Sequence, residues 1–253
     1  MRSIALKLFL MGGIGWLPLC AAAGEPAAGR QVEQAWQSKS AGKIPFLLYL
    51  PEGYGEDGGG KRWPVMLFLH GRGESRGPLS VVKKWGPPRL VERGEDLPYI
   101  VVSPQCPKES RWTADEQQAG VLELLEHIRK SYATDGDRVY LTGLSMGGFG
   151  SWKLAANHGE KFAAVAPICG IGDPADAEKL KSIPIWAFHG TEDKAVPFSG
   201  SKDVVDAIVR VGGKQVKFTS LEGVGHNSWS AAYATPELYS WFDSFTRSGR
   251  RAD

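Results

Sequence analysis

The stretch TGLSMGGFG at residues 142–150 places one serine, Ser145, among four glycines. An apolar run precedes it at residues 139–141, and a helical pattern follows at residues 146–157. A sharp turn from a strand into a helix holds a serine oxygen clear of the sheet, and glycine fits the crowded positions on both sides of it. We interpret Ser145 as a nucleophile. The alternative is a glycine-rich helix start that Ser145 merely caps.

The pattern around this turn recurs along the chain. Short apolar runs bounded by proline and glycine are often continuous, which suits strands buried on both faces of a parallel sheet. They lie at residues 46–50, 65–69, 99–102, 139–141, 162–168, 185–188 and 216–219, and helical patterns lie at residues 114–131, 146–157, 200–211 and 236–246. Strands alternating with helices predict an α/β fold: a doubly wound, mostly parallel sheet with helices on both faces.

The clearest helical pattern, residues 114–131, carries Val121, Leu124 and Ile128 on one stripe. Thr113 and Glu116 have the spacing of a capping box, so we expect the Thr113 side chain to cap this helix.

The first 29 residues differ from the rest. A basic start is followed by an apolar run to Leu19 and by small residues up to Ala23. This is the layout of a secretory signal peptide, and we expect cleavage after Ala23, a secreted or periplasmic protein and one catalytic domain over residues 24–253. A lipoprotein anchored at Cys20 is the less favoured alternative, because Leu19 is bulky where a small residue is wanted.

The charge balance limits the partners. The chain has 253 residues and a formal net charge of +2. Loss of residues 1–23 would remove two basic residues and no acidic one, which leaves the mature chain about neutral. Nucleic acid and anionic membranes attract a basic footprint. We therefore expect no nucleic-acid partner and no membrane insertion after cleavage of the signal peptide.

A serine nucleophile needs a base, and the base needs an orienting carboxylate. In this kind of sheet the ligand site lies where strands end, and the expected order is Ser, then Asp or Glu, then His. Three histidines follow Ser145, and His226, in the flexible stretch GVGHN after the last apolar run, is the best placed. Asp193 follows the run at residues 185–188 and is the favoured acid. The alternatives are a solvated loop histidine and an aspartate that only bonds its own turn.

Acyl transfer also needs N–H donors for the oxyanion. The backbone N–H of Met146, next after the serine, is the first candidate. The second comes from the loop HGRG at residues 70–73, where we favour the Arg72 N–H over that of Gly73. His70 is expected to brace this loop.

Five motifs now stand in order: LHGRGES, PQCP, GLSMGGFGSW, FHGTEDKAVP and GHNSW. Together they resemble the α/β-hydrolase superfamily. More narrowly they are similar to small secreted esterases of the feruloyl esterase, polyhydroxybutyrate depolymerase and "predicted peptidase" type, near dienelactone hydrolase and phospholipase/carboxylesterase. The resemblance covers residues 44–245. It implies a triad of Ser145, Asp193 and His226, with Arg72 and Met146 lining the oxyanion hole, and no cofactor.

The resemblance also bears on the cysteines. It implies a strand order with two strands between those at residues 99–102 and 162–168. At about 4.8 Å per strand, Cys106 and Cys169 would start well beyond the ~5.5 Å Cα separation of a disulfide. Loops could close the gap, so the pairing stays open. No cysteine and histidine cluster has metal-ligand spacing.

Aromatic side chains near the strand ends are candidates for the substrate pocket. Trp112 and Trp229 could stack on a phenolic or sugar group, although ordinary packing accounts for each as well. Gln105 and Arg111 are weaker candidates. The connection at residues 170–183 is too short for a cap domain, so we expect an open, shallow site.

These features predict a secreted serine carboxylic-ester hydrolase acting through an acyl-enzyme on short-chain or aromatic, feruloyl-type esters. Its partner would be a small or polymer-attached ester. The alternatives are a polyester depolymerase, a peptidase, or a catalytically silent binding protein on the same scaffold.

Overall fold

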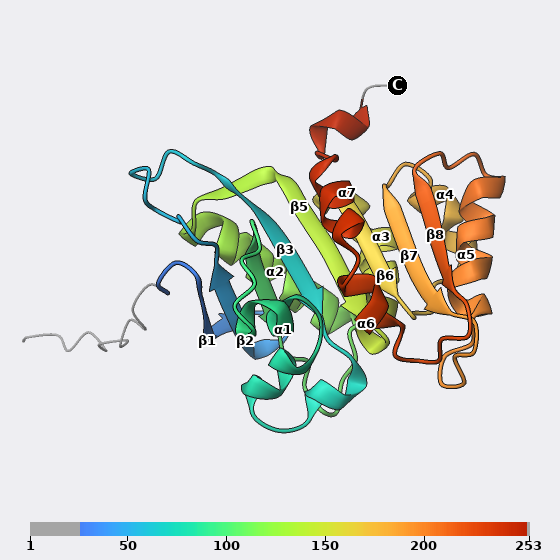
Figure 1. Cartoon of the computed structure of the whole chain (residues 1–253), viewed down its shortest axis with the longest axis horizontal. Helices are drawn as coiled ribbons and strands as arrows, with labels where there is room; N and C mark the ends of the chain where they lie inside the picture. The colour runs from blue at the N-terminus through green and yellow to red at the C-terminus, as the bar shows by residue number, and fades with distance from the viewer. Residues whose placement is uncertain (1–25, 252–253) are drawn as a thin grey trace, which may run out of the picture.

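The computed structural model describes residues 26–251, so the expected signal peptide and its cleavage site lie outside the described residues. One sheet of eight strands runs through the molecule in the order β1-β2-β4-β3-β5-β6-β7-β8 (Figure 1). The strands are β1 Arg30–Ser38, β2 Gly42–Leu50, β3 Trp63–Leu69, β4 Ile100–Pro104, β5 Thr134–Leu144, β6 Ala164–Ile168, β7 Ile185–Gly190 and β8 Val216–Leu221.

The sheet is parallel from β4 to β8, and antiparallel where β2 pairs with β1 and with β4. Two strands, β3 and β5, separate β4 from β6, as the resemblance implied. All parallel strands therefore end at one edge, and the loops that follow β3, β5, β7 and β8 meet there. The structure confirms the α/β fold with a mostly parallel, doubly wound sheet.

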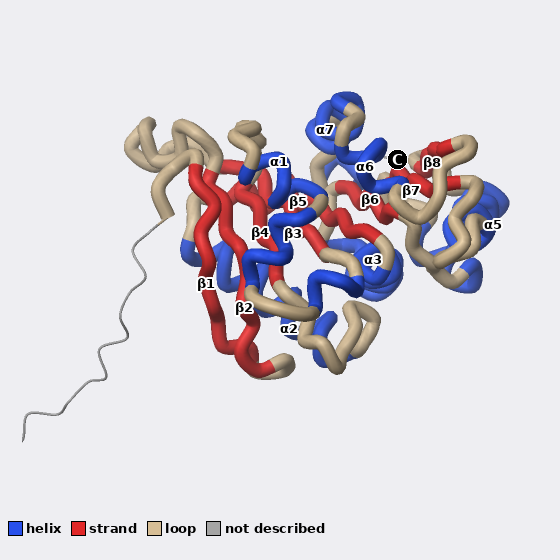
Figure 2. The backbone as a smooth tube through the Cα atoms, turned by 60° about the horizontal axis from the view of Figure 1, so that its bottom comes forward, coloured by secondary structure: helices blue, strands red, loops and turns tan. Residues whose placement is uncertain are grey.

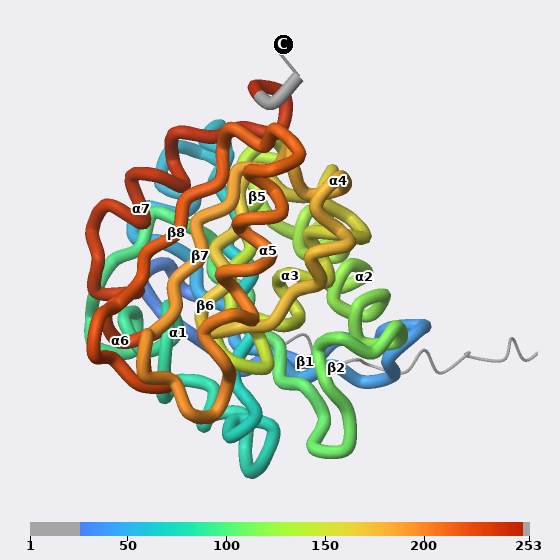
Figure 3. The backbone as a smooth tube through the Cα atoms, turned by 90° about the vertical axis from the view of Figure 1, so that its right-hand side faces the viewer, coloured from blue at the N-terminus to red at the C-terminus, as the bar shows by residue number. Residues whose placement is uncertain are grey.

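Helices cover both faces of the sheet. Figure 3 shows α2, α3, α4 and α5 along one face and α1, α6 and α7 along the other, and Figure 2 shows the same layers from another side. Their bounds are α1 Gly86–Glu92, α2 Asp115–Ser131, α3 Met146–His158, α4 Ala177–Leu180, α5 Ser199–Arg210, α6 Ser228–Tyr233 and α7 Pro236–Asp243. The seven residues of β3 are all buried, and they alternate between the two cores.

Strand β1 is absent from the sequence-based prediction. Its sequence, RQVEQAWQS, is mostly polar and half-exposed, because the strand lies at the edge of the sheet. It is held by its full-length antiparallel pairing with β2, from Arg30 opposite Leu50 to Ser38 opposite Gly42. Backbone pairing at an edge needs no continuous apolar run, so the pattern used for the other strands could not find it.

The expected cap of α2 is wrong. The helix begins after Ala114, and no side chain caps it. Glu116 instead accepts a hydrogen bond from the Ser110 hydroxyl at 3.2 Å. The Glu116 carboxylate is thus bonded to the loop before the helix, and the reciprocal bond of a capping box does not form.

The connection at residues 170–183 holds a short 3-10 turn, Pro174–Asp176, and helix α4. Ala177 and Leu180 of α4 are buried in the core beside α3 and α5. This segment packs on a sheet face, and no cap domain stands between β6 and β7.

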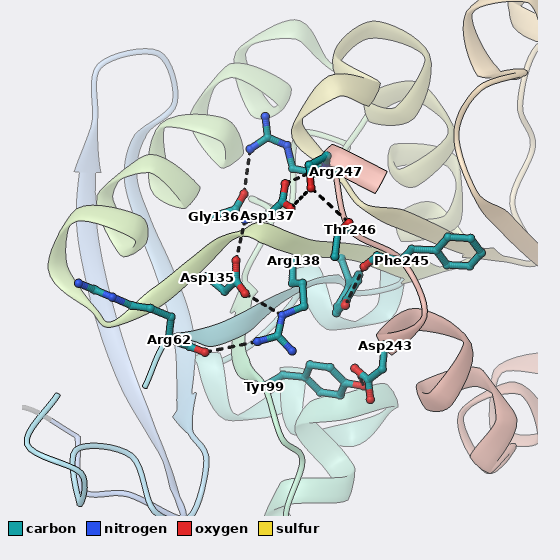
Figure 4. Close-up of polar contacts among 12 residues, drawn as sticks. Arg62, Tyr99, Asp135, Gly136, Asp137, Arg138, Asp243, Phe245, Thr246 and Arg247 are labelled. Carbon is teal, nitrogen blue, oxygen red and sulfur yellow. Dashed lines mark hydrogen bonds and ion pairs between the residues drawn. The ribbon is translucent and has the colours of Figure 1, made fainter. Parts of the chain in front are cut away.

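The C-terminal segment after α7 is tied back to the start of β5 (Figure 4). The Arg247 guanidinium donates to the Gly136 carbonyl at 2.8 Å, and the Ser248 N–H donates to Asp137 at 2.9 Å. Asp243, at the end of α7, accepts a hydrogen bond from the Tyr99 hydroxyl at 2.9 Å. The segment that follows β8 is therefore anchored through Asp243, Arg247 and Ser248. This anchoring restricts the movement of the loop directly after β8.

Cys106 and Cys169 are both buried and free. Within residues 26–251, no helix combines the length and apolarity that a membrane crossing needs.

Candidate active site

Ser145 occupies the turn between β5 and α3. Its φ of 51° lies in the left-handed region, which a non-glycine residue rarely adopts. The turn is held on both sides, because the Ser145 N–H donates to the Ile168 carbonyl at 2.9 Å and its carbonyl accepts from the Phe149 N–H at 3.0 Å. A strained backbone at the start of a buried helix lifts this hydroxyl out of the sheet edge.

The glycines beside the serine have a steric cause. A Cβ added to Gly143 would lie 2.5 Å from the Gly147 carbonyl oxygen. A Cβ on Gly147 would lie 1.8 Å from the carbonyl oxygen of Leu69, the last residue of β3. Both obstacles are backbone atoms that cannot rotate away. The crowding inferred from the sequence is therefore present, and it comes from the neighbouring strand and the first turn of α3.

His226 lies in the loop after β8 and reaches back to Ser145. Its Nε2 is 3.0 Å from the Ser145 Oγ, and its Nδ1 is 2.7 Å from the Asp193 Oδ2. Because a carboxylate only accepts, Nδ1 carries the proton and Nε2 presents its lone pair to the hydroxyl. Three residues far apart in the sequence thus form one hydrogen-bonded row: Ser145, His226, Asp193.

Asp193 follows β7 and is buried. Its Oδ1 accepts from the N–H groups of Ala195 and Val196, each at 2.9 Å, so its Oδ2 is left for His226. Burial alone would raise the pKa of this carboxyl, but the hydrogen bonds from His226, Val196 and Ala195 outweigh it and lower the pKa. Asp193 is therefore ionised at neutral pH and held in one orientation.

His189, the fifth residue of β7, lies behind Asp193. Its Nε2 is 3.1 Å from the Val196 carbonyl oxygen and 3.2 Å from the Asp193 Oδ2. Burial lowers the pKa of His189, which keeps its ring neutral. His189 is one of the three histidines that follow Ser145 in the sequence, and in the structure it supports the loop that carries Asp193. Its spacing of four residues from Asp193 was the available signal.

Two backbone N–H groups begin helices beside the hydroxyl. Met146 is the first residue of α3, and Arg72 is the first residue of a 3-10 turn, Arg72–Ser75, that follows β3. First-turn N–H groups have no carbonyl partner within their own helix and carry partial positive charge. Both residues line one cavity with Ser145 and His226.

The loop that carries Arg72 is fixed by His70. Its Nε2 accepts from the Cys106 N–H at 2.9 Å, so the opposite nitrogen, Nδ1, donates to the Gly71 carbonyl at 2.6 Å. Burial lowers the pKa of His70 to about 4, which keeps this tautomer neutral. Holding the Gly71 carbonyl fixes the peptide plane whose other end is the Arg72 N–H. The structure thus agrees with the expected bracing role of His70.

Two expected pocket residues serve the same loop instead. Trp112 is 2% exposed, and its indole N–H donates to the His70 carbonyl at 2.9 Å. The Gln105 side chain donates to the Glu74 carbonyl at 2.9 Å. Neither residue lines the cavity at Ser145. Both side chains are instead used in holding the loop after β3, so the structure gives their assignment to substrate binding no support.

Trp229 lies against His226. Its ring meets the His226 ring edge to face, with centroids 5.2 Å apart, and the Trp85 ring packs on the Trp229 ring with centroids 5.8 Å apart. Trp229 does not line the cavity at Ser145 but a second one of about 640 Å³, together with Trp85 and Arg89. Its contact with His226 restricts the movement of the imidazole.

The cavity at Ser145 has a volume of about 540 Å³. Phe149, Met146 and Val196 give it apolar walls, and Arg72 and Arg111 bring cations to it. Phe149 and Val196 were not singled out in the sequence, although both lie within the motifs that contain Ser145 and Asp193. This is enough room for a short acyl chain or one aromatic ring.

One group among the described residues could hold a metal ion: the ligand atoms of Cys169, Asp193 and His226 lie within 4.8 Å of one another. Two of these residues already bond to each other, and burial raises the pKa of the Cys169 thiol to about 12. A neutral thiol is a poor ligand. The arrangement serves proton transfer along the row better than metal binding.

Comparison with known proteins gives a consistent family. Residues 38–235 match the family model Esterase, described as "Putative esterase". A crystal structure titled as that of a thermostable esterase superposes with a TM-score of 0.71 at 32% identity, covering 85% of this chain and 63% of that one. A feruloyl esterase module from Clostridium thermocellum, complexed with sinapinate, has the same fold, with a TM-score of 0.65 at 20% identity over 86% of this chain and 88% of that one.

Curated relatives agree. The bifunctional acetylxylan esterase/xylanase XynS20E of Neocallimastix patriciarum is 30% identical over 53% of this chain, which spans only 20% of that protein's length. The poly(3-hydroxyoctanoate) depolymerase of Pseudomonas fluorescens is 24% identical over 84% of each chain. With the family model covering most of its length and the α/β-hydrolase fold in place, the chain belongs to the Esterase family.

Proposed function

We propose that this protein is a serine carboxylic-ester hydrolase that works through an acyl-enzyme, with Ser145 as nucleophile, His226 as base and Asp193 as the orienting acid. The observation that carries the proposal is the position of His226, whose two ring nitrogens lie 3.0 Å from the Ser145 Oγ and 2.7 Å from the Asp193 Oδ2. A neutral imidazole so placed can take the serine proton while the carboxylate stabilises the resulting cation.

In the first half-reaction the Ser145 Oγ attacks the ester carbonyl and its proton passes to the His226 Nε2. The oxyanion forms beside the N–H groups of Arg72 and Met146, whose partial positive charge stabilises it. The C–O bond to the alcohol then breaks, and His226 returns the proton to the leaving oxygen. In the second half-reaction His226 takes a proton from a water molecule, which attacks the acyl carbonyl. The bond to the Ser145 Oγ then breaks, His226 returns the proton to that oxygen, and the carboxylic acid leaves. No step requires a cofactor.

The cavity supports a proposal for the substrate class. Its apolar walls and its volume of about 540 Å³ suit a short acyl chain or a single aromatic ring. The packing of the segment between β6 and β7 on a sheet face leaves the site without a lid from that segment. We favour short-chain and feruloyl-type esters, and several relatives carry the name feruloyl esterase. Long-chain esters would gain little from so open a site.

A polyester oligomer is the second candidate. The observation in its favour is the relative named poly(3-hydroxyoctanoate) depolymerase, which aligns with 84% of this chain and 84% of its own length. An export signal at the N-terminus would fit either substrate, since polymers are attacked outside the cell.

Hydrolysis of p-nitrophenyl acetate, butyrate and decanoate and of methyl ferulate tests the proposal, with wild type beside Ser145→Ala. Wild type is expected to cleave the short and aromatic esters, and the variant to lose activity by at least a thousandfold, on the order of the loss when a catalytic nucleophile is removed. Covalent labelling of Ser145 by a fluorophosphonate is the second readout. Equal activity of both proteins would show that the serine assignment is wrong, and the absence of any hydrolysis or labelling would favour a silent binding protein.

A further inference from the structure

The cavity at Ser145 contains two arginines, and neither is neutralised. Arg72 and Arg111 both line it. Among residues 26–251, every ion pair within 4.0 Å is made by other side chains. The chain as a whole is close to neutral, with 30 basic and 28 acidic residues. The cavity lining holds these two arginines and one carboxylate, Glu109, so cationic side chains outnumber anionic ones there.

The acidic groups near the cavity are occupied elsewhere. Glu109, the one exposed carboxylate in its lining, pairs with Lys108 at 3.7 Å, and its side chain is 87% exposed. Glu116 accepts from the Ser110 hydroxyl. Asp193 is buried behind His226 and saturated by its own loop. No carboxylate of the described residues closes the donor face of either arginine.

Arg72 is held in place beside the nucleophile. One nitrogen of its guanidinium, Nη1, donates to the Ser110 carbonyl and lies 3.8 Å from the Met146 sulfur. Met146 directly follows Ser145, so this positive group lies on the wall of the cavity that Ser145 lines. A guanidinium has five N–H donors, and those not used by Ser110 match the two oxygens of a carboxylate.

We propose that the natural ester substrate carries a carboxylate a few bonds from the scissile ester, and that Arg72 and Arg111 bind it. This inference rests on the proposed esterase function and adds the substrate's charge to it. The anion would lie within the cavity, where the apolar walls of Phe149 and Val196 reduce the competition from water and strengthen the pairing. An ester without a charge would use the same catalytic row but would leave the guanidinium groups unpaired.

Two matched pairs of esters test the inference at pH 7.5, where a carboxylate is ionised. In the first pair, mono-p-nitrophenyl glutarate carries the anion on the acyl side, and p-nitrophenyl 5-methylhexanoate has the same shape without charge. In the second pair, 4-carboxyphenyl butyrate carries the anion on the alcohol side, and 4-carbamoylphenyl butyrate is its neutral counterpart. The readout is the anionic-to-neutral ratio of kcat/KM, compared between variants so that the intrinsic reactivity of each ester cancels.

In the double variant Arg72→Gln/Arg111→Gln this ratio is expected to fall about tenfold for at least one pair, as loss of a charge-assisted contact in a partly open site implies. Raising NaCl from 20 to 500 mM should lower the ratio for wild type and leave it nearly constant for the variant. Lys130→Gln, which removes one positive charge from the last turn of α2 away from this cavity, is the control and should keep the wild-type ratio.

The outcomes separate the two proposals. If wild type cleaves the neutral esters but the ratio is the same in wild type and double variant for both pairs, the carboxylate inference is overturned and the esterase proposal stands. If wild type cleaves neither the anionic nor the neutral esters, the esterase proposal itself fails. Thermal unfolding of each variant checks that these substitutions of exposed residues leave the fold intact.

Discussion

The orientation of Asp193 leads to a quantitative prediction for Asp193→Asn. The Oδ1 of this side chain accepts two backbone N–H groups, from Ala195 and Val196, each at 2.9 Å. An asparagine will keep its carbonyl oxygen there, which turns its NH₂ toward the His226 Nδ1. Two donors cannot face each other, so His226 must move its proton to Nε2 and can no longer accept the proton of Ser145.

The size of the expected loss of activity follows from the hydrogen bonds that the side chain at position 193 makes. Turning the amide over would restore the correct tautomer but would lose two buried hydrogen bonds, at about 1–1.5 kcal/mol each. The contact regained with the His189 Nε2, 3.2 Å from the present Oδ2, offsets part of this cost. A net preference of about 2 kcal/mol leaves roughly one molecule in thirty with the productive tautomer. Replacing a charged acceptor by a neutral one costs about another factor of ten.

We therefore expect kcat of Asp193→Asn to fall about 300-fold, with little change in KM, because the cavity walls are untouched. The assay is hydrolysis of p-nitrophenyl butyrate under saturating substrate, with near-ultraviolet circular dichroism to verify folding. Glu192→Gln is the matched control, since it makes the same chemical change one residue earlier at an exposed position and should retain wild-type activity. A loss of less than tenfold in Asp193→Asn would refute the tautomer argument.

Three further predictions follow from packing and ionisation. Gly147→Ala should be inactive and destabilised by about 3 kcal/mol or more, because its Cβ would lie 1.8 Å from the Leu69 carbonyl oxygen. The control is Gly73→Ala, whose Cβ would meet nothing within 4 Å and which should match wild type in urea unfolding. The folded-state pKa of His70, about 4, is below its unfolded value of 6.5, so its contribution to stability is full above pH 6.5 and is lost as pH falls toward 4. The unfolding free energy of wild type relative to His70→Asn should therefore drop by about 3 kcal/mol between pH 7 and pH 4, and a constant difference would contradict a neutral, buried imidazole. Cys106 and Cys169 are buried, and burial raises the pKa of each thiol to about 12. Both should resist iodoacetamide in the native protein and react with it after denaturation without reductant. Protection that persists in the denatured protein until reductant is added would indicate a disulfide.

The parts of this fold that could be predicted are those in which a local pattern has a local cause. Continuous apolar runs mark strands buried on both faces, and the crowded turn at Ser145 demands glycine at fixed positions on either side. The apolar pattern did not predict strand β1, because this edge strand is held by backbone pairing rather than by apolar side chains. The cap of α2 failed because Glu116 bonds to Ser110, a contact between loop residues that no helix rule describes.

Trp112 and Trp229 show, near the site, the same limit of prediction from a local sequence pattern. Trp112 and Trp229 both follow strand ends, and sequence position alone gave them the same expected role. The structure separates them by the partner that each finds: the indole N–H of Trp112 bonds to the His70 carbonyl in the core, and the ring of Trp229 packs on His226. Which way a side chain turns from a strand-end loop depends on neighbours distant in the sequence, so no local pattern reports it.

The same dipeptide, His-Gly, occurs twice at the edge of the sheet where the site lies. The dipeptide His-Gly ends β7 and directly follows β3, as His189-Gly190 and His70-Gly71. In both places the imidazole is buried, its pKa is lowered by burial, and a ring nitrogen holds a carbonyl of the following loop: Gly71 for His70 and Val196 for His189.

The two glycines of these pairs also have a common cause. A Cβ on Gly71 would lie 2.7 Å from Leu144 beside the nucleophile, and a Cβ on Gly190 would lie 2.2 Å from the Val224 carbonyl oxygen in the loop that carries His226. Each His-Gly pair thus lets one loop approach another closely and then fixes it there without adding a charge. One fixed loop carries the Arg72 N–H and the other carries Asp193, so in the proposed mechanism the two neutral histidines position the groups on either side of Ser145 and His226.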